Sequence, residues 1–138
     1  MAKRTTIPAP RGFFHHPIPL GAKIGNVVCS SDLAGRDPVS GEMPSEPSRQ
    51  AENLFKNIKT FLEQAGGSPA NIIHIALWIK EGKHEECMEA INKEWLKMFP
   101  NDNDRPARNA KKWNPFGFVG AAGRGETLFQ ADIVAVLD

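Results

Sequence analysis

The sequence predicts an α+β fold, in which two amphipathic helices pack on one face of a sheet of four to six strands. Two segments repeat apolar residues at three- and four-residue spacing, which is typical of half-buried helices. Shorter β-branched segments lie before, between and after them. A length of 138 residues suffices for one well-filled core and is short for two. We therefore expect a single domain over residues 1–138.

The chain is expected to begin with an irregular arm over residues 1–19. Pro8, Pro10, Pro17 and Pro19 each remove a backbone donor and fix a backbone angle, which disfavours regular structure. After the arm, the β-branched segment Ile24–Ser30 predicts a first short strand.

The first helix is the clearest element of the sequence. Ser48 is a suitable N-cap, and Gly66-Gly67 provides a residue that tolerates the left-handed conformation at the C-terminus. The helix has one wide apolar stripe, made of Ala51, Leu54, Phe55, Ile58, Phe61, Leu62 and Ala65.

The segment Ile72–Ile79 predicts a strand with apolar residues on both faces. Ile73, Ile75, Leu77 and Ile79 would share one face, opposite His74 and Trp78. No third helix is available to cover the second face. We therefore expect identical chains to associate there.

The C-terminal half predicts a second helix and two more strands. The helix runs from His84 to Phe99 and is closed by Pro100. Strands are expected over Phe118–Ala121 and Thr127–Leu137.

Composition excludes several classes of protein. The net charge of +1 gives no global attraction to nucleic acid, and no apolar run approaches a membrane span. Cys29 and Cys87 are too few and too far apart for a disulfide framework or a zinc site, and we interpret both as buried apolar residues. The adjacent His15 and His16 lack metal-ligand spacing, so no metal is expected. A cytoplasmic setting follows as the expectation.

The step Pro106-Ala107-Arg108 is the main functional signal. Arginine presents a planar fork of donors that fits a carboxylate in bidentate fashion and keeps its charge near neutral pH. A site for a small carboxylic acid is therefore predicted at Arg108.

At this point the chain resembles the Rid family (YjgF/RidA-like enamine and imine deaminases). The resemblance extends from about Gly21 to Leu137. It rests on Gly25-Asn26-Val27-Val28, Asp37-Pro38-Val39-Ser40-Gly41-Glu42, Gln50, Asn57-Ile58, Ala65-Gly66, Asn92, Pro106-Ala107-Arg108 and Ala131-Asp132-Ile133-Val134-Ala135-Val136. It implies a chorismate-mutase-like fold, a homotrimer with clefts between subunits, and hydrolysis of 2-imino acids to 2-keto acids and ammonia without metal or organic cofactor.

The resemblance also assigns residue roles. Arg108 corresponds to the arginine that grips the substrate carboxylate, and Asn92 to the helix asparagine near the site. Ser31 lies in the stretch that is Ser-Gly-Gln in relatives and reads Ser31-Asp32-Leu33 here. Relatives place a tyrosine of the arm against the substrate; this chain has none, and Phe14 and His16 occupy that region.

Gln130 stands where active relatives carry a glutamate that orients or activates water. An amide cannot take up a proton, although it can orient water by hydrogen bonding. Asp132 lies two residues further on the same strand face and is the candidate replacement; as an alternative, it is a polar residue of a trimer contact.

Two further functions stay open from the sequence. Loss of the glutamate favours a non-catalytic protein that binds small carboxylic acids at Arg108. Family members have also been described as ribonucleases or translation inhibitors, and cations mix with an aromatic side chain at Arg105, Arg108, Lys111, Lys112, Trp113 and Arg124. Interleaved acids and the lack of a suitable pair of histidines make nucleic acid the less favoured partner.

Overall fold

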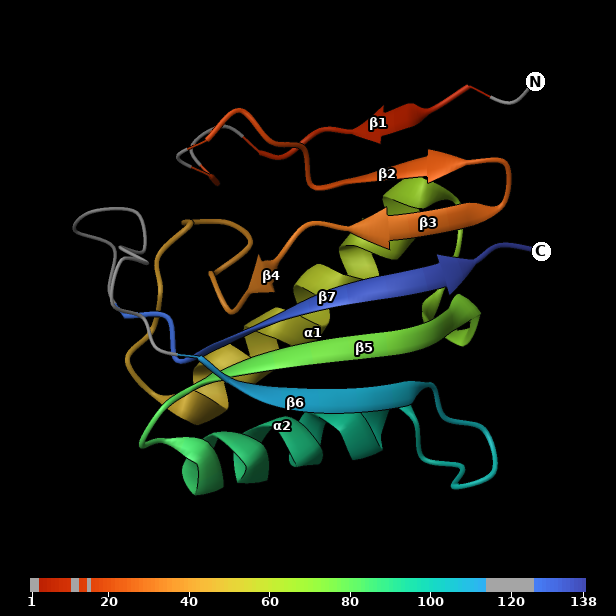
Figure 1. Ribbon diagram of the computed structural model, residues 1–138. Coiled ribbons are helices and arrows are strands. Elements are labelled where there is room, and N and C mark those ends of the chain that lie inside the picture. Colours follow the sequence, from red (N-terminus) through yellow and green to blue (C-terminus); the bar gives the residue numbers. More distant parts are fainter. Residues whose placement is uncertain (1–2, 11–12, 15, 114–125) are drawn as a thin grey trace.

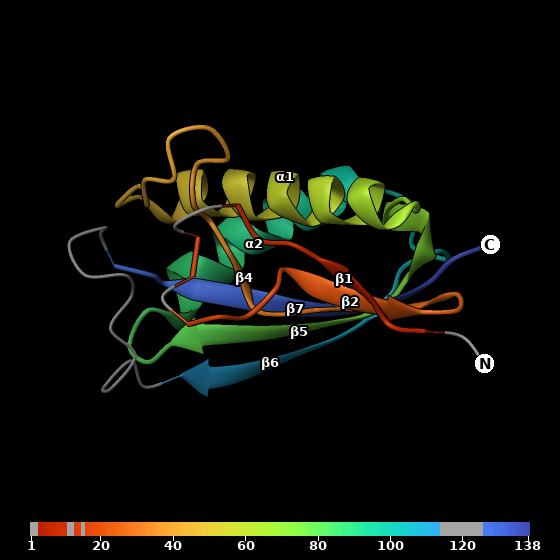
Figure 2. The same ribbon diagram turned by 90° about the horizontal axis from the view of Figure 1, so that it is seen from above.

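The computed structural model describes residues 3–10, 13–14, 16–113 and 126–138. The helices α1 (Pro47–Ala65) and α2 (His84–Met98) both pack on one face of a mixed sheet (Figures 1 and 2). Within the described residues no helix covers the other face, which is called the open face below. The predicted α+β layer arrangement is confirmed.

Within the described residues the sheet has seven strands, more than the four to six expected, in the order β1-β2-β3-β7-β5-β6, and β4 also pairs with β7. Only β5 and β6 pair in parallel; the other pairs are antiparallel. The strands are β1 Thr5–Ile7, β2 Gly21–Ile24, β3 Val27–Ser30, β4 Leu33–Ala34, β5 Ile72–Lys80, β6 Ala107–Trp113 and β7 Phe129–Val136, with a 3₁₀ turn at Pro69–Asn71.

Helix α1 buries the whole predicted apolar stripe. Its start differs from the prediction, because Pro47 occupies the first turn and the extended Glu46 is the N-cap, so Ser48 already lies inside the helix. Its end is as expected: Gly66 adopts φ 94°, a left-handed conformation that glycine tolerates without steric cost.

Two buried amides of α1 fix the segment that carries β4. Asn57 Nδ2 donates to the carbonyls of Ala34 and Arg36, both at 2.9 Å, and Asn53 Nδ2 donates to Gly35 at 3.2 Å. The two backbones approach so closely that a Cβ at position 35 would lie 2.2 Å from the carbonyl oxygen of Gln50. The position of β4 is therefore set by polar contacts and a glycine, not by apolar packing alone.

Strand β5 follows the predicted alternation from Ile75 onward. A register irregularity between Ile72 and His74 changes the start of the strand: Ile72 is buried, and Ile73, expected in the core, is 53% exposed on the surface. A bulge adds one residue to a strand and so reverses the side on which the preceding side chains lie. His74, Ala76, Trp78 and Lys80 are half-buried on the open face.

Several predicted strand boundaries were wrong. Ile24–Ser30 is a hairpin and not one strand, because Gly25 at φ 57° turns the chain between β2 and β3. Thr5–Ile7 is a strand inside the arm expected to be irregular, and it ends just before Pro8. Strand β6 was missed because its polar sequence lacks an apolar alternation. The expected strand Phe118–Ala121 lies outside the described residues.

The open face is partly apolar in the single chain. Ile24 is 52% exposed and Val27 46% exposed at one end of the sheet. Cys29 is also exposed, so in the single chain it does not lie in the apolar surroundings expected for it, whereas Cys87 is buried on the inner side of α2. Burial raises the pKa of the Cys87 thiol to about 11, so this thiol stays protonated and unreactive.

Candidate active site: two half-sites on opposite faces of the sheet

Arg108 lies on edge strand β6 and is directed toward α2. It pairs in register with Ile75, which is fully buried on the helix-covered face. Its Nη1 donates to Asn92 Oδ1 at 2.9 Å, and its guanidinium carbon lies 4.7 Å from the ring centroid of Trp95. Arg108 and Asn92, which the resemblance assigned to one site, are therefore in direct contact, and stacking on Trp95 fixes the plane of the guanidinium.

Arg108 has no carboxylate partner among the described residues. Each ion pair found there is formed by a lysine. The side chain is half-buried, and this burial lowers the pKa of the guanidinium, which still remains charged at neutral pH. A half-buried cation that is positioned by neutral groups is well suited to receive an anion from outside the chain.

The second set of predicted residues lies on the open face. Gln130 and Asp132 alternate with the buried Ala131 on β7. Asp132 Oδ2 accepts a hydrogen bond from Trp78 Nε1 at 3.1 Å, and Lys111 Nζ lies 5.2 Å from the centroid of the same indole ring. Trp78 thus links one anion and one cation across β7, β5 and β6.

The predicted residues of the arm and of the β3–β4 connection have different environments. Ser31 is half-buried and its hydroxyl donates to the carbonyl of Pro19 at 2.8 Å. Phe14 is half-buried, packs against the core and meets Phe13 edge to face at 5.1 Å. His16 is exposed.

The predicted site residues do not form one pocket within a single chain. Arg108 and Asn92 lie on the helix-covered face at the β6 edge, while Gln130 and Asp132 lie on the open face of β7, with β5 between these strands. We call the first group the arginine half-site and the second group the open-face half-site. The contacts of Trp95 and Trp78 were not predicted, because a tryptophan in an apolar segment is hard to distinguish from a core residue.

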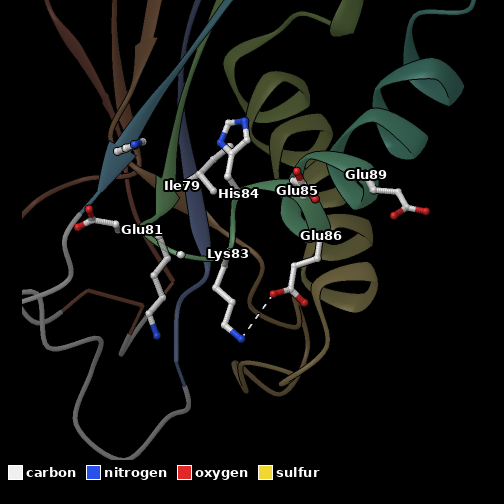
Figure 3. Close-up of a pocket in the computed structure, with 10 residues that line it drawn as sticks. Ile79, Glu81, Lys83, His84, Glu85, Glu86 and Glu89 are labelled. Carbon is white, nitrogen blue, oxygen red and sulfur yellow. Dashed lines mark ion pairs between the residues drawn. The ribbon is translucent and has the colours of Figure 1, made fainter.

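The structure also has a pocket of 590 Å³ where β5 ends and α2 begins. Figure 3 shows that charged side chains dominate it, with Lys83 and Glu86 paired at 3.5 Å and His84 and Glu89 nearby. None of the predicted site residues lines it. Its mixed charges favour no particular ligand.

The part of the chain that the structure describes has neither a metal-binding cluster nor a membrane-spanning helix. Its His, Cys, Asp and Glu side chains form no group of three or more that could hold a metal ion. None of its helices is long and apolar enough to cross a membrane.

Comparison with known proteins identifies the class. The family model described as Endoribonuclease L-PSP matches residues 10–112, and the chain therefore belongs to this family, which is also known as the Rid/YjgF family. The resemblance inferred from the sequence is thereby confirmed.

The chain is similar to several named relatives. A RutC family protein of Pasteurella multocida is 31% identical over 88 residues, covering 62% of this chain and 66% of that protein. A 2-iminobutanoate/2-iminopropanoate deaminase of Escherichia coli (strain K12) is 28% identical over 65 residues, covering 47% of this chain and 51% of the enzyme. The chain thus matches less than two thirds of the length of these curated relatives.

Solved structures share the fold. RidA of the Antarctic bacterium Psychrobacter aligns with a TM-score of 0.71 at 23% identity, covering 96% of this chain and 94% of that one. A hypothetical protein of Giardia lamblia aligns with a TM-score of 0.80 at 18% identity, covering 99% and 100% of the two chains. At these identities the likeness shows the fold alone.

Proposed function

We propose that this protein hydrolyses the C=N bond of 2-imino carboxylic acids, giving 2-keto acids and ammonia. One observation carries the proposal: Arg108 is half-buried, held by Asn92 and Trp95, and has no acidic partner among the described residues. Relatives named as 2-iminobutanoate/2-iminopropanoate deaminases support the reaction class.

The two half-sites are complementary parts of such a site. The arginine half-site supplies a charged fork for the carboxylate. The open-face half-site supplies one carboxylate, Asp132, which can take up a proton, and one amide, Gln130, which can orient water. Since these groups lie on opposite faces of one sheet, we propose that a second copy of the chain joins them, in a homotrimer with one cleft at each contact. The exposed Ile24, Val27 and Ile73 of the open face support such an assembly.

The reaction asks little of the protein beyond positioning. Imines of this class hydrolyse spontaneously in water, so fixing the carboxylate and polarising the C=N bond is enough for useful catalysis.

The test is direct. A set of 2-imino acids is generated in situ with an amino-acid oxidase, and their loss is followed with wild type, Arg108→Ala and Arg108→Lys. Removal of a buried charge partner costs about 2–5 kcal/mol, so Arg108→Ala should reduce kcat/KM by at least about 30-fold. Arg108→Lys keeps the charge and loses the fork, and it should recover only part of the rate.

Arg105→Ala is the matched control, because Arg105 is an exposed arginine three residues away whose Nε donates to the carbonyl of Phe99 at 3.0 Å. Its kcat/KM should stay within about twofold of wild type. If wild type in its assembled form accelerates the loss of no imino acid, the proposal is wrong.

Binding of small carboxylic acids without turnover is the second candidate, and Gln130 favours it because an amide cannot carry a proton. In that case keto or amino acids would bind wild type and not Arg108→Ala, with no turnover by either. RNA is a weaker candidate, because alternation along β6 places Lys111 and Lys112 on opposite faces. Arg124 of the predicted cationic cluster lies outside the described residues.

A further inference from the structure

The β3–β4 connection contains an acidic residue, Asp32, for which the sequence predicted no role. Leu33 pairs with Ala131 and Ala34 pairs with Gln130 in antiparallel register. Continuing that register by one residue sets Asp32 directly opposite Asp132. Because Leu33 and Ala131 are fully buried on the helix side, both aspartates lie on the open face.

A bulge produces this alignment. Strand β3 pairs with β7 as Val28 with Ala135, whereas β4 pairs as Leu33 with Ala131, so the connection contains one residue more than the facing strand. At the irregularity the backbone N–H of Ile133 is satisfied by the Ser30 hydroxyl at 2.9 Å. Bulges of this kind redirect side chains and recur beside active sites.

The two facing carboxylates have different environments. Asp132 accepts the Trp78 indole N–H, and Trp78 in turn has Lys111 over its ring. Within the described chain, Asp32 is half-buried and forms no ion pair with a cation. Its burial, followed by the charge of Asp132, raises the pKa of the Asp32 carboxyl above its usual value. Like charges placed opposite each other on a sheet destabilise the fold unless one of them is protonated.

We infer that Asp32 is the residue that moves protons in the open-face half-site, with Asp132 as its fixed anionic neighbour and Gln130 as a group that can only orient water. This inference rests on the proposed imine hydrolysis.

The hydrolysis can be written with Asp32 as the only protein group that gives and takes up protons. Protonated Asp32 gives its proton to the imine nitrogen, a water oxygen bonds to the imine carbon, and the excess proton of that water returns to Asp32, giving a carbinolamine. Asp32 then protonates the amine nitrogen, and the C–N bond breaks with its electron pair leaving on ammonia. The hydroxyl of the carbinolamine becomes the keto oxygen and returns its proton to Asp32. No oxidant, reductant or further reactant is needed.

The test compares three variants in the assembled protein. Asp32→Asn should lower kcat by at least about 100-fold with a smaller change in KM, because general acid–base groups typically contribute 10²–10⁴-fold. Asp32→Glu should restore part of kcat. Asp37→Asn is the control: Asp37 lies in an exposed turn, where backbone N–H groups of Val39 and Ser40 lower the pKa of its carboxyl, and kcat should not change.

A readout independent of activity separates proton transfer from structure. An NMR titration of the ¹³C-labelled aspartate carboxyls, assigned through loss of the signal in Asp32→Asn, should show a raised pKa for Asp32 that falls in Asp132→Asn. Thermal unfolding should show Asp32→Asn to be more stable than wild type at neutral pH. The folded protein binds the Asp32 proton more tightly than the unfolded chain, so stability is lost as pH rises from the unfolded pKa through the folded one, and the amide removes this loss.

The outcomes distinguish the two proposals. An inactive wild type overturns the proposed function. An active wild type with an equally active Asp32→Asn overturns only the role of Asp32. The role of Asp32 is also overturned if the Asp32 carboxyl has an ordinary or low pKa in the assembled protein and Asp32→Asn no longer assembles. Asp32 would then be an ion-pair partner between copies of the chain.

Discussion

The two faces of the sheet place charges of opposite sign in their half-sites. On the helix-covered face, Arg108 is held by an amide oxygen and an indole ring and forms no ion pair with an acid of the described chain. On the open face, Asp32 and Asp132 face each other, and only Asp132 receives a hydrogen bond from the neighbouring indole. The arrangement around Arg108 can accept an anion. The arrangement of the two aspartates favours binding of a proton, and their mutual repulsion when both are charged lowers the stability of the fold.

The two half-sites differ in the chemistry proposed for them. The half-site proposed to bind the carboxylate contains Arg108 and its contact with Asn92. The part expected to handle protons has an amide at Gln130 and an additional carboxylate at Asp32. We therefore expect mutations to change the proposed carboxylate binding and the proposed proton transfer separately.

Of the three substitutions, Asn57→Ala is expected to have the largest effect. It removes the hydrogen bonds that hold the segment 34–36 beside the open-face half-site. Asn57 is buried and satisfies two carbonyls of the segment 34–36, so its loss leaves buried acceptors unpaired. We expect a loss of about 3 kcal/mol in the free energy of unfolding, measured by urea denaturation. Lys56→Ala, an exposed neighbour on the same helix, should change it by less than about 0.5 kcal/mol.

Asn57→Ala also tests the comparison between faces. The rate of proton transfer should fall, because β4 loses its position. The affinity of Arg108 for a non-reactive keto acid should remain near the wild-type value below the unfolding transition. A proportional loss of both would show that the half-sites do not act separately.

Asn92→Asp should have the next largest effect, and it acts on the arginine half-site alone. A carboxylate at position 92 would pair with Arg108 and occupy the fork meant for the substrate. We expect KM to rise by about 30-fold, which corresponds to about 2 kcal/mol, with kcat changed much less. Lys93→Ala, exposed on the same helix, serves as the control. An unchanged KM in Asn92→Asp would contradict carboxylate binding at Arg108.

The sequence predicted both helices and the central strand because their apolar periodicity is strong. It missed β6, because Ala107–Trp113 is a polar edge strand whose place is set by parallel pairing with β5. The family resemblance assigned both Arg108 and Asn92 to the site, and the structure brings the two side chains into contact. The sequence could not show that Asp32 faces Asp132, because that pairing depends on a bulge and a register that no local pattern encodes.

Trp78→Phe should have the smallest effect and the most specific one. The substitution keeps most of the aromatic surface over which Lys111 lies, but removes the indole N–H that Asp132 accepts at 3.1 Å. A single hydrogen bond to a charged group contributes about 1.5–3 kcal/mol at most, and less where the group is only half-buried, so kcat should fall by about 5- to 10-fold. KM should not change, because Trp78 lies on the open face and Arg108 on the other.

Steady-state kinetics on one imino acid measures both parameters. Trp95→Phe is the reciprocal variant, in which KM is expected to change and kcat is not. If Trp78→Phe instead altered KM, the open face would contribute to carboxylate binding and the division of labour between the two faces would be wrong.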